Sequence, residues 1–250
     1  MNEMHQIACW LLEAGDIALR SSNAPKRVAK ADGSALSEAD IAIDNYLRKR
    51  IYSEEKDAII QSEEGGGPQT GKRWIIDSLD GTASYFEGLA HWGPVIGKVD
   101  ANDSPLMGAM YLPKTSEFYF AKKGVGAFFC GQQLSSVDSR PVPKSPVAYV
   151  PSRFPFSKEL AKHFKLRNLG STSTHLCHVA ATKASVAIIP PGWSKWDVVA
   201  GELLLNETKA LIWSPCGHGF RGNRPLIVAG QAESVNTISK ILINNLSFKR

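Results

Sequence analysis

The sequence lacks the usual signals of a membrane or secreted protein. No apolar run reaches the roughly 20 residues that a membrane-spanning helix needs, and residues 1–6 are polar, with no basic region leading into an apolar stretch. The four cysteines, Cys9, Cys130, Cys177 and Cys216, are scattered and form no CxxC pair. This pattern favours free thiols in a reducing compartment over a disulfide framework. We therefore expect a cytoplasmic protein with no membrane partner.

Blocks of like charge and internal repeats are absent as well. Lys and Arg outnumber Asp and Glu by 29 to 24, a formal net charge of +5, yet they form no basic block of the kind that marks a nucleic-acid-binding arm. The mild excess suits an anionic ligand, and we expect no nucleic acid as a stable partner. With 250 residues, 43% of them hydrophobic, the chain can bury a core in one large domain or two modest ones.

The stretch that carries the clearest chemistry is residues 74–82, WIIDSLDGT. Its apolar start predicts a buried strand, Gly81 predicts the turn that ends it, and a helix should begin at or just after Thr82. Asp77 and Asp80 then lie between strand and helix, where two carboxylates repel each other unless a cation lies between them. Magnesium prefers such oxygen ligands, and the N–H groups at a helix start suit a phosphate. By itself the loop is equally consistent with a solvated turn.

Periodicity places the other elements around this stretch. A helix is predicted at 7–19, and a second runs from the polar cap at Ser37 to Ile51, with Asp40 in its first turn. Taken alone, Asp40 is explained by the helix dipole. The glycines at 65–67 predict a hairpin tip between strands at 58–60 and 74–76, which would carry Glu63 towards Asp77.

Later segments alternate in the same way. Strands are predicted at 95–99, 106–111, 118–121, 147–150, 184–189, 211–213 and 226–229, and helices at 158–164, 176–183, 196–205 and 235–242. The composition changes to a proline-rich stretch at Pro141, Pro143 and Pro146, so we place a domain boundary there. The prediction is an N-terminal α+β domain over 1–140 and a C-terminal α/β domain over 141–250.

Several stretches, in order along nearly the whole chain, resemble the inositol monophosphatase superfamily of magnesium-dependent, lithium-sensitive phosphatases. The family pattern is an acidic pair after a strand, then D-P-[I/L]-D-G-T, then W-D-x-A-A-G. The matching stretches are Ser62-Glu63-Glu64, Asp77-Ser78-Leu79-Asp80-Gly81-Thr82 and Trp196-Asp197-Val198-Val199-Ala200-Gly201. The segment from Lys30 to Asp40 and the pair Gly170-Ser171 are also similar to the family.

The resemblance implies a fold of the α/β (α+β) class, a layered α/β/α/β/α sandwich of the inositol monophosphatase and fructose-1,6-bisphosphatase type, and a homodimer. It also implies hydrolysis of a small phosphorylated metabolite with two or three Mg²⁺ ions. The implied metal ligands are the carboxylates of Glu63, Asp77, Asp80 and Asp197 and the backbone carbonyl of Leu79.

The same resemblance implies roles around the metal ligands. Gly81 and Thr82 would bind phosphate through backbone N–H groups, and Asp40 would hydrogen-bond the Thr82 hydroxyl and help to orient the attacking water. The implied catalytic residues are Asp40, Thr82 and Glu63, and the implied substrate-side residues are Lys30, Ser171 and Lys195.

Departures from the family pattern leave the substrate open. Ser78 replaces the usual proline, and Pro190 stands where many inositol phosphatases carry a glutamate that holds a substrate hydroxyl. Residues 88–93 are spaced like those of histidinol-phosphate phosphatases, whereas Arg153 and Lys195 are more like 3′(2′),5′-bisphosphate nucleotidases. Inositol phosphate is the family default. A non-catalytic protein that keeps the metal and phosphate site is the alternative outside this class.

Overall fold

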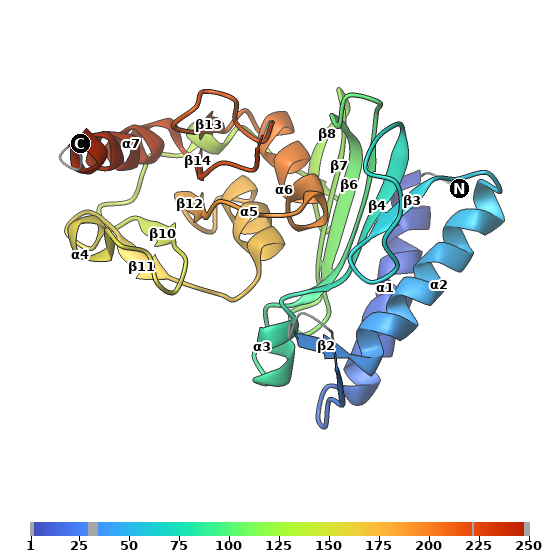
Figure 1. Ribbon diagram of the computed structural model, residues 1–250. Coiled ribbons are helices and arrows are strands. Elements are labelled where there is room, and N and C mark those ends of the chain that lie inside the picture. Colours follow the sequence, from blue (N-terminus) through green and yellow to red (C-terminus); the bar gives the residue numbers. More distant parts are fainter. Residues whose placement is uncertain (1–2, 30–34, 222, 248–250) are drawn as a thin grey trace.

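The computed structural model describes residues 3–29, 35–221 and 223–247, which form five alternating layers of helices and sheets (Figure 1). The first layer holds α1 (Glu3–Ser21) and α2 (Glu38–Glu54), the third holds α5 (Thr172–Ala180) and α6 (Lys195–Glu207), and the fifth holds α4 (Ser157–Leu160) and α7 (Ala232–Ser247). The second and fourth layers are sheets. The predicted α/β/α/β/α sandwich is therefore confirmed.

The second layer is a seven-stranded sheet in the order β3-β4-β5-β6-β7-β8-β9. Its strands are β3 (Ile60–Ser62), β4 (Arg73–Asp80), β5 (Gly93–Val99), β6 (Pro105–Leu112), β7 (Glu117–Lys122), β8 (Gly126–Phe129) and β9 (Gln132–Gln133). All neighbours are antiparallel except β3 and β4. The short helix α3 (Thr82–Phe86) follows β4 directly.

The fourth layer is a five-stranded mixed sheet in the order β11-β10-β12-β14-β13. Its strands are β10 (Val147–Tyr149), β11 (Lys165–Arg167), β12 (Val186–Ile189), β13 (Leu211–Trp213) and β14 (Ile227–Gly230). A separate ribbon pairs β1 (Arg27–Ala29) with β2 (Ala35–Ser37), and the 3₁₀ turn η1 (Val137–Ser139) precedes β10. Among the described helices, none combines the length and apolar composition that a membrane crossing requires.

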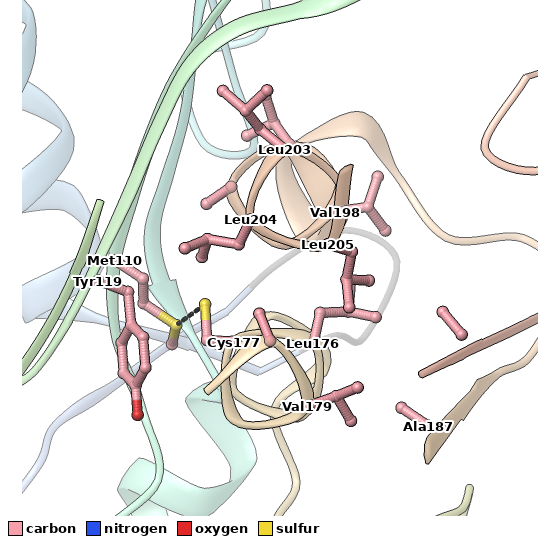
Figure 2. Close-up of a cluster of buried hydrophobic side chains, with 14 of the residues drawn as sticks. Met110, Tyr119, Leu176, Cys177, Val179, Ala187, Val198, Leu203, Leu204 and Leu205 are labelled. Carbon is pink, nitrogen blue, oxygen red and sulfur yellow. Dashed lines mark hydrogen bonds between the residues drawn. The ribbon is translucent and has the colours of Figure 1, made fainter. Parts of the chain in front are cut away.

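Three hydrophobic cores fill the spaces between layers, and the middle one extends on both sides of α5 and α6 to reach both sheets. Figure 2 shows part of the middle one, where Leu176 of α5 and Leu204 of α6 lie between the two sheets. Cys177 on α5 points at the seven-stranded sheet, and its Sγ donates to Met110 Sδ at 3.8 Å. This core takes side chains from both sides of residue 140, so the division into domains at that point stays a prediction.

The hairpin predicted around residues 65–67 is wrong. Strands β3 and β4 are parallel neighbours, and parallel strands cannot be joined by a tight hairpin. The chain instead turns after Ser62 and returns along the outer edge of β3, where Ser62 and Gly66 form an isolated antiparallel bridge. Gly67, at φ 123°, is needed there because a Cβ would lie 2.1 Å from the Ile60 carbonyl oxygen.

Two further predictions differ in extent. The helix expected at 158–164 is only the short α4, because the chain leaves it to form β11, which was not predicted. The strand expected at 74–76 continues to Asp80, and all eight residues of β4 are buried.

Helix α6 packs directly against the seven-stranded sheet because two neighbouring sheet residues beneath it are glycines, which have no side chain. Gly97 and Gly108 face each other across β5 and β6. A Cβ on Gly97 would lie 2.4 Å from Cγ2 of Val199, and one on Gly108 would lie 2.6 Å from the Cα of Ala200. This close approach sets where the first turn of α6 points.

We expect the Gly97→Ala substitution to lower the free energy of unfolding by about 2 kcal/mol, because the added methyl overpacks this contact. The three atoms nearest to that methyl all belong to the Val199 side chain. Val199→Ala should therefore relieve part of the strain, and the double variant should lose less stability than the sum of the single variants. Urea unfolding measures all three. Gly108→Ala, which meets backbone, is the control that Val199→Ala should not rescue; strict additivity at Gly97 would contradict the packing argument.

Candidate functional site

A bulge near the end of β4 brings Asp77 and Asp80 to the same face of the sheet. Asp77 pairs with Val95 and Asp80 with Gly93, so three steps along β4 match two along β5. Without this extra residue, side chains three apart would point to opposite faces. Asp77 shares its face with Ile75 of the middle core, while Leu79 packs into the core beneath α1 and α2.

Gly81 ends the strand and starts α3 in a left-handed conformation, at φ 90°. A Cβ there would lie 2.8 Å from the His91 carbonyl oxygen, so glycine is needed for the turn. The Thr82 hydroxyl donates to the carbonyl of Leu79 at 3.0 Å. The predicted turn and the helix starting at Thr82 are both present.

Glu63 directly follows the edge strand β3 and lies beside the end of β4, since its N–H donates to the Ile76 carbonyl at 3.2 Å. Arg48 of α2 stabilises the turn that follows Ser62. Its Nη2 donates to Ser62 Oγ at 2.6 Å, and the same hydroxyl accepts from the N–H of Gly65 at 2.8 Å. The guanidinium thus fixes the residues on both sides of Glu63.

Asp197 reaches the cluster from the start of α6. Its carboxylate accepts from the N–H of Ser194 at 2.5 Å, closing a capping box. Its own carbonyl accepts from Ser173 Oγ at 2.8 Å. The carboxylate of Asp80 accepts from Ser171 Oγ at 2.7 Å and from the N–H of Ser173 at 2.6 Å. The beginnings of α5 and α6 are therefore joined to the end of β4.

The cluster is electrostatically strained. Burial raises the pKa of Asp77 well above its usual range, and the charges of Glu63, Asp80 and Asp197 add to the rise. Burial also raises the pKa of Asp80, which the hydrogen bonds from Ser171 and Ser173 oppose. For Asp197, burial and the charge of Asp80 raise the pKa to about 7.

A divalent cation fits this donor set. Within the described residues, Asp77, Asp80 and Asp197 form no ion pair, so hydrogen bonds and the charge of Arg224 offset only part of their repulsion. Hard cations take carboxylate and carbonyl oxygens. In the described part of the chain, no three His, Cys, Asp or Glu side chains are already arranged to hold a metal ion. One oxygen of each aspartate is instead held by a backbone or hydroxyl donor.

The remaining predicted residues lie at different distances from this centre. Asp40 is buried at the start of α2, in a capping box with Ser37, and its charge contributes to the raised pKa of Asp77. The Thr82 hydroxyl must turn away from Leu79 to donate to Asp40, so that contact stays a prediction. Lys195 forms a buried ion pair with Glu202 at 2.8 Å. Lys30 lies outside the described residues.

The sequence interpretation missed Arg48 and Ser173. Ser173 follows the Gly170-Ser171 pair but belongs to no motif. Arg48 stands four residues after Asp44, whose carboxylate accepts from its Nε at 2.6 Å. That spacing signals a helix ion pair, but nothing local indicates that the other end of the guanidinium reaches Ser62.

We expect the metal-free protein to lose stability as the pH rises from about 4 to about 8. The folded aspartates keep protons where unfolded aspartates, with a pKa near 3.9, are ionised, so the folded state binds more protons across this window. In the Asp197→Asn variant, the decrease in the free energy of unfolding across this pH range should be smaller by about 2 kcal/mol. Urea unfolding in the presence of chelator measures this free energy at each pH, and substitution of the exposed Asp57 by Asn is the control. Parallel curves for Asp197→Asn and the native protein would contradict the assignment.

We expect Arg48→Met to weaken Mg²⁺ binding about tenfold, as loss of support behind a metal ligand does. Arg50→Met is the matched control, because Arg50 lies on the same helix and pairs with Glu13 on the surface at 2.7 Å. Calorimetric titration compares the two variants. Equal Mg²⁺ affinities would show that Arg48 supports the fold only.

Comparisons with known proteins point to one family. A family model described as "Inositol monophosphatase family" matches residues 2–243. The Nus factor SuhB of Vibrio cholerae is 27% identical over 249 residues, covering 92% of this chain and 91% of the relative. A fructose-1,6-bisphosphatase/inositol-1-monophosphatase of Aquifex aeolicus is 27% identical over 214 residues, covering 79% and 80%.

Solved structures show the same fold. An IMPase of Thermotoga maritima superimposes with a TM-score of 0.86 at 20% identity, covering 98% of this chain and 99% of that one. The extragenic suppressor protein suhB of Bartonella henselae gives 0.84 at 20% identity, covering 96% and 98%. Because the family match runs through β4, α5 and α6 and includes every residue of the acidic cluster, this chain belongs to the inositol monophosphatase family.

Proposed function

We propose that the protein is a magnesium-dependent phosphatase that hydrolyses a small phosphate monoester. The observation that carries the proposal is the cluster of carboxylates formed by the buried Asp77 and Asp80 and the half-buried Asp197, with Glu63 beside it. Acids withdrawn from water with no cation in contact cost stability, and family membership makes a metal centre the natural reason for keeping them.

In this proposal, Glu63, Asp77, Asp80, Asp197 and the Leu79 carbonyl hold two or three Mg²⁺ ions. When bound, magnesium neutralises phosphate charge and lowers the pKa of water. The protein's own part is positioning, which phosphoryl transfer mainly requires.

Residues next to the acids would hold the reactants. The N–H groups of Gly81 and Thr82 would hold the phosphate at the start of α3. Asp40 and the Thr82 hydroxyl would orient the attacking water, with Asp40 accepting its proton. The hydroxyl of Ser171 would fix Asp80, and through Asp80 the substrate side of the site. Lys30 would lie at the rim.

The leaving group is less defined than the phosphate. Pro190 is exposed directly after β12 and has neither a side-chain acceptor nor an N–H, so the hydroxyl contact expected from a family glutamate is missing. Inositol phosphate is therefore only the default, and histidinol phosphate and a 3′(2′),5′-bisphosphate nucleotide are the alternatives.

The names of some relatives suggest a second candidate function. Several are Nus factors, so family membership alone does not imply catalysis, and a non-catalytic metal- and phosphate-binding protein is the second candidate. The complete acidic set favours hydrolysis. We further propose a cytoplasmic homodimer that has no stable nucleic-acid partner.

We expect Mg²⁺-dependent phosphate release that chelator abolishes and lithium inhibits. Asp197→Asn should lower kcat by about a hundredfold or more, since it removes a metal ligand. Glu64→Gln should have little effect, because Glu63, and not Glu64, is the glutamate whose charge acts on Asp77, Asp80 and Asp197. A phosphate-release assay over a panel of phosphate monoesters compares the two variants. Equal activity in excess chelator would overturn the metal assignment, and equal losses in both variants would reassign the ligand.

A further inference from the structure

The residues just before α5 carry the hydroxyl that holds Asp80. Leu169, Gly170 and Ser171 connect β11 of the fourth layer to α5 of the third, so the chain crosses between layers here. Ser171 Oγ donates to the Asp80 carboxylate at 2.7 Å. The Cβ of Ser171 also lies 3.2 Å from the position that a Cβ on Gly81 would take. A displacement of this segment would therefore reach both Asp80 and the turn that starts α3.

Both backbone groups of Leu169 are held by side chains from helices. Its N–H donates to His175 Nε2 at 2.9 Å, and its carbonyl accepts from Ser84 Oγ of α3 at 3.2 Å. His175 lies one helical turn after Ser171, and its own N–H donates to the Ser171 carbonyl at 3.1 Å. Side chains on a helix lean towards its N-terminus, which is how the imidazole reaches back to Leu169. His175 therefore contacts the chain on both sides of Gly170.

The imidazole of His175 is buried, neutral and fixed in orientation. Because the Leu169 N–H donates to Nε2, that nitrogen carries no proton. Burial, together with the charges of His178 and His91, lowers the pKa of His175 to about 3, so the acceptor is present at neutral pH. The ring stacks on Tyr149, with centroids 4.6 Å apart and 9° between the planes. This stacking restricts rotation of the ring away from Leu169.

The stacking partner Tyr149 is held in turn by a buried chain of hydrogen bonds. Tyr149 ends β10, and its hydroxyl lies 3.0 Å from Nδ1 of His178 on α5. His178 Nε2 donates to the carboxylate of Glu117 on β7 at 3.2 Å, and the same carboxylate accepts from Lys183 at 2.6 Å. Since a carboxylate only accepts, neutral His178 carries its proton on Nε2 and accepts from the Tyr149 hydroxyl. These bonds link both sheets through α5.

We infer that His175 is a positioning residue for the acidic cluster: it holds Leu169, and through residues 169–171 it places the Ser171 hydroxyl on Asp80. The inference deepens the proposed function, because its effect on Mg²⁺ rests on Asp80 being a metal ligand. The contact with Leu169 itself can be measured without metal.

Hydrogen exchange of the Leu169 amide in the metal-free protein tests the contact. His175→Phe keeps a ring against Tyr149 but removes the acceptor, so this amide should exchange about tenfold faster, while amides of β5 and β6 report any general loss of stability. His175→Gln should restore protection, because its side-chain carbonyl can accept from the same N–H. Tyr149→Phe is the matched control, since it removes a hydrogen bond from the same buried stack and keeps the acceptor. Native exchange at Leu169 in His175→Phe would overturn the inference.

Calorimetric titration with Mg²⁺ tests the effect on the cluster. Ser171→Gly removes the hydroxyl with little loss of helix capping. This variant and His175→Phe should each weaken Mg²⁺ binding about tenfold. The double variant should bind about as weakly as Ser171→Gly alone, because His175 acts through that hydroxyl. Tyr149→Phe should bind as the native protein does. Additive losses in the double variant, or native Mg²⁺ affinity in His175→Phe, would show that His175 supports the fold only.

The two measurements separate this inference from the proposed function. If the native protein bound no Mg²⁺, the metal assignment would fall, and exchange at Leu169 would still decide whether His175 holds this segment. If the native protein bound Mg²⁺ and released phosphate, but Mg²⁺ affinity ignored His175, only the positioning role would fall.

Discussion

Mutual repulsion among carboxylates that are largely withdrawn from water is the constraint on which the rest of this structure depends. Asp77 and Asp80 are buried, Asp197 beside them is half-buried, and loss of hydration raises the pKa of each. Such a group costs folding free energy unless a cation compensates it. Much of the local architecture exists to hold these acids in place, namely the bulge in β4, the capping box of α6 and the donors at the start of α5.

Helix α6 connects this cluster to the rest of the molecule. Its first turn supplies Asp197, and its middle rests on the paired glycines Gly97 and Gly108. Its face that carries Lys195 and Glu202 forms one wall of a cavity of about 540 Å³. A shift of this helix would therefore move Asp197 relative to Asp77 and Asp80, and the contact with the sheet leaves no room for a methyl group at Gly97.

The departures from the family pattern fall on both sides of this centre. Ser78 is buried in β4, and its hydroxyl has no hydrogen-bond partner within the described residues. The loop nevertheless keeps both aspartates on one face, because the bulge and not the usual proline sets the register. Pro190 lies outside the acidic cluster. All the acids of the proposed metal site are thus present while a position on the proposed substrate side has changed, and the names of relatives divide between phosphatases and Nus factors.

Local sequence determined the features that depend on neighbours along the chain. These are the long helices, the cap formed by Ser37 and Asp40, the buried strand before Asp77, the glycine turn and the motif that identifies the family. Each follows from periodicity, from side chains three or four residues apart, or from the conformational freedom of glycine. The layered fold followed from that motif and not from periodicity, which cannot order the strands.

Only the tertiary structure decided how distant segments meet. Strand β3 pairs in parallel with β4, where the sequence predicted a hairpin. The bulge in β4 determines the face on which Asp80 lies, and Arg48 of α2 hydrogen-bonds Ser62 at the end of β3. The physical reason is that ion pairing, burial and pKa depend on what packs against a side chain, and those neighbours come from elements far apart in the sequence.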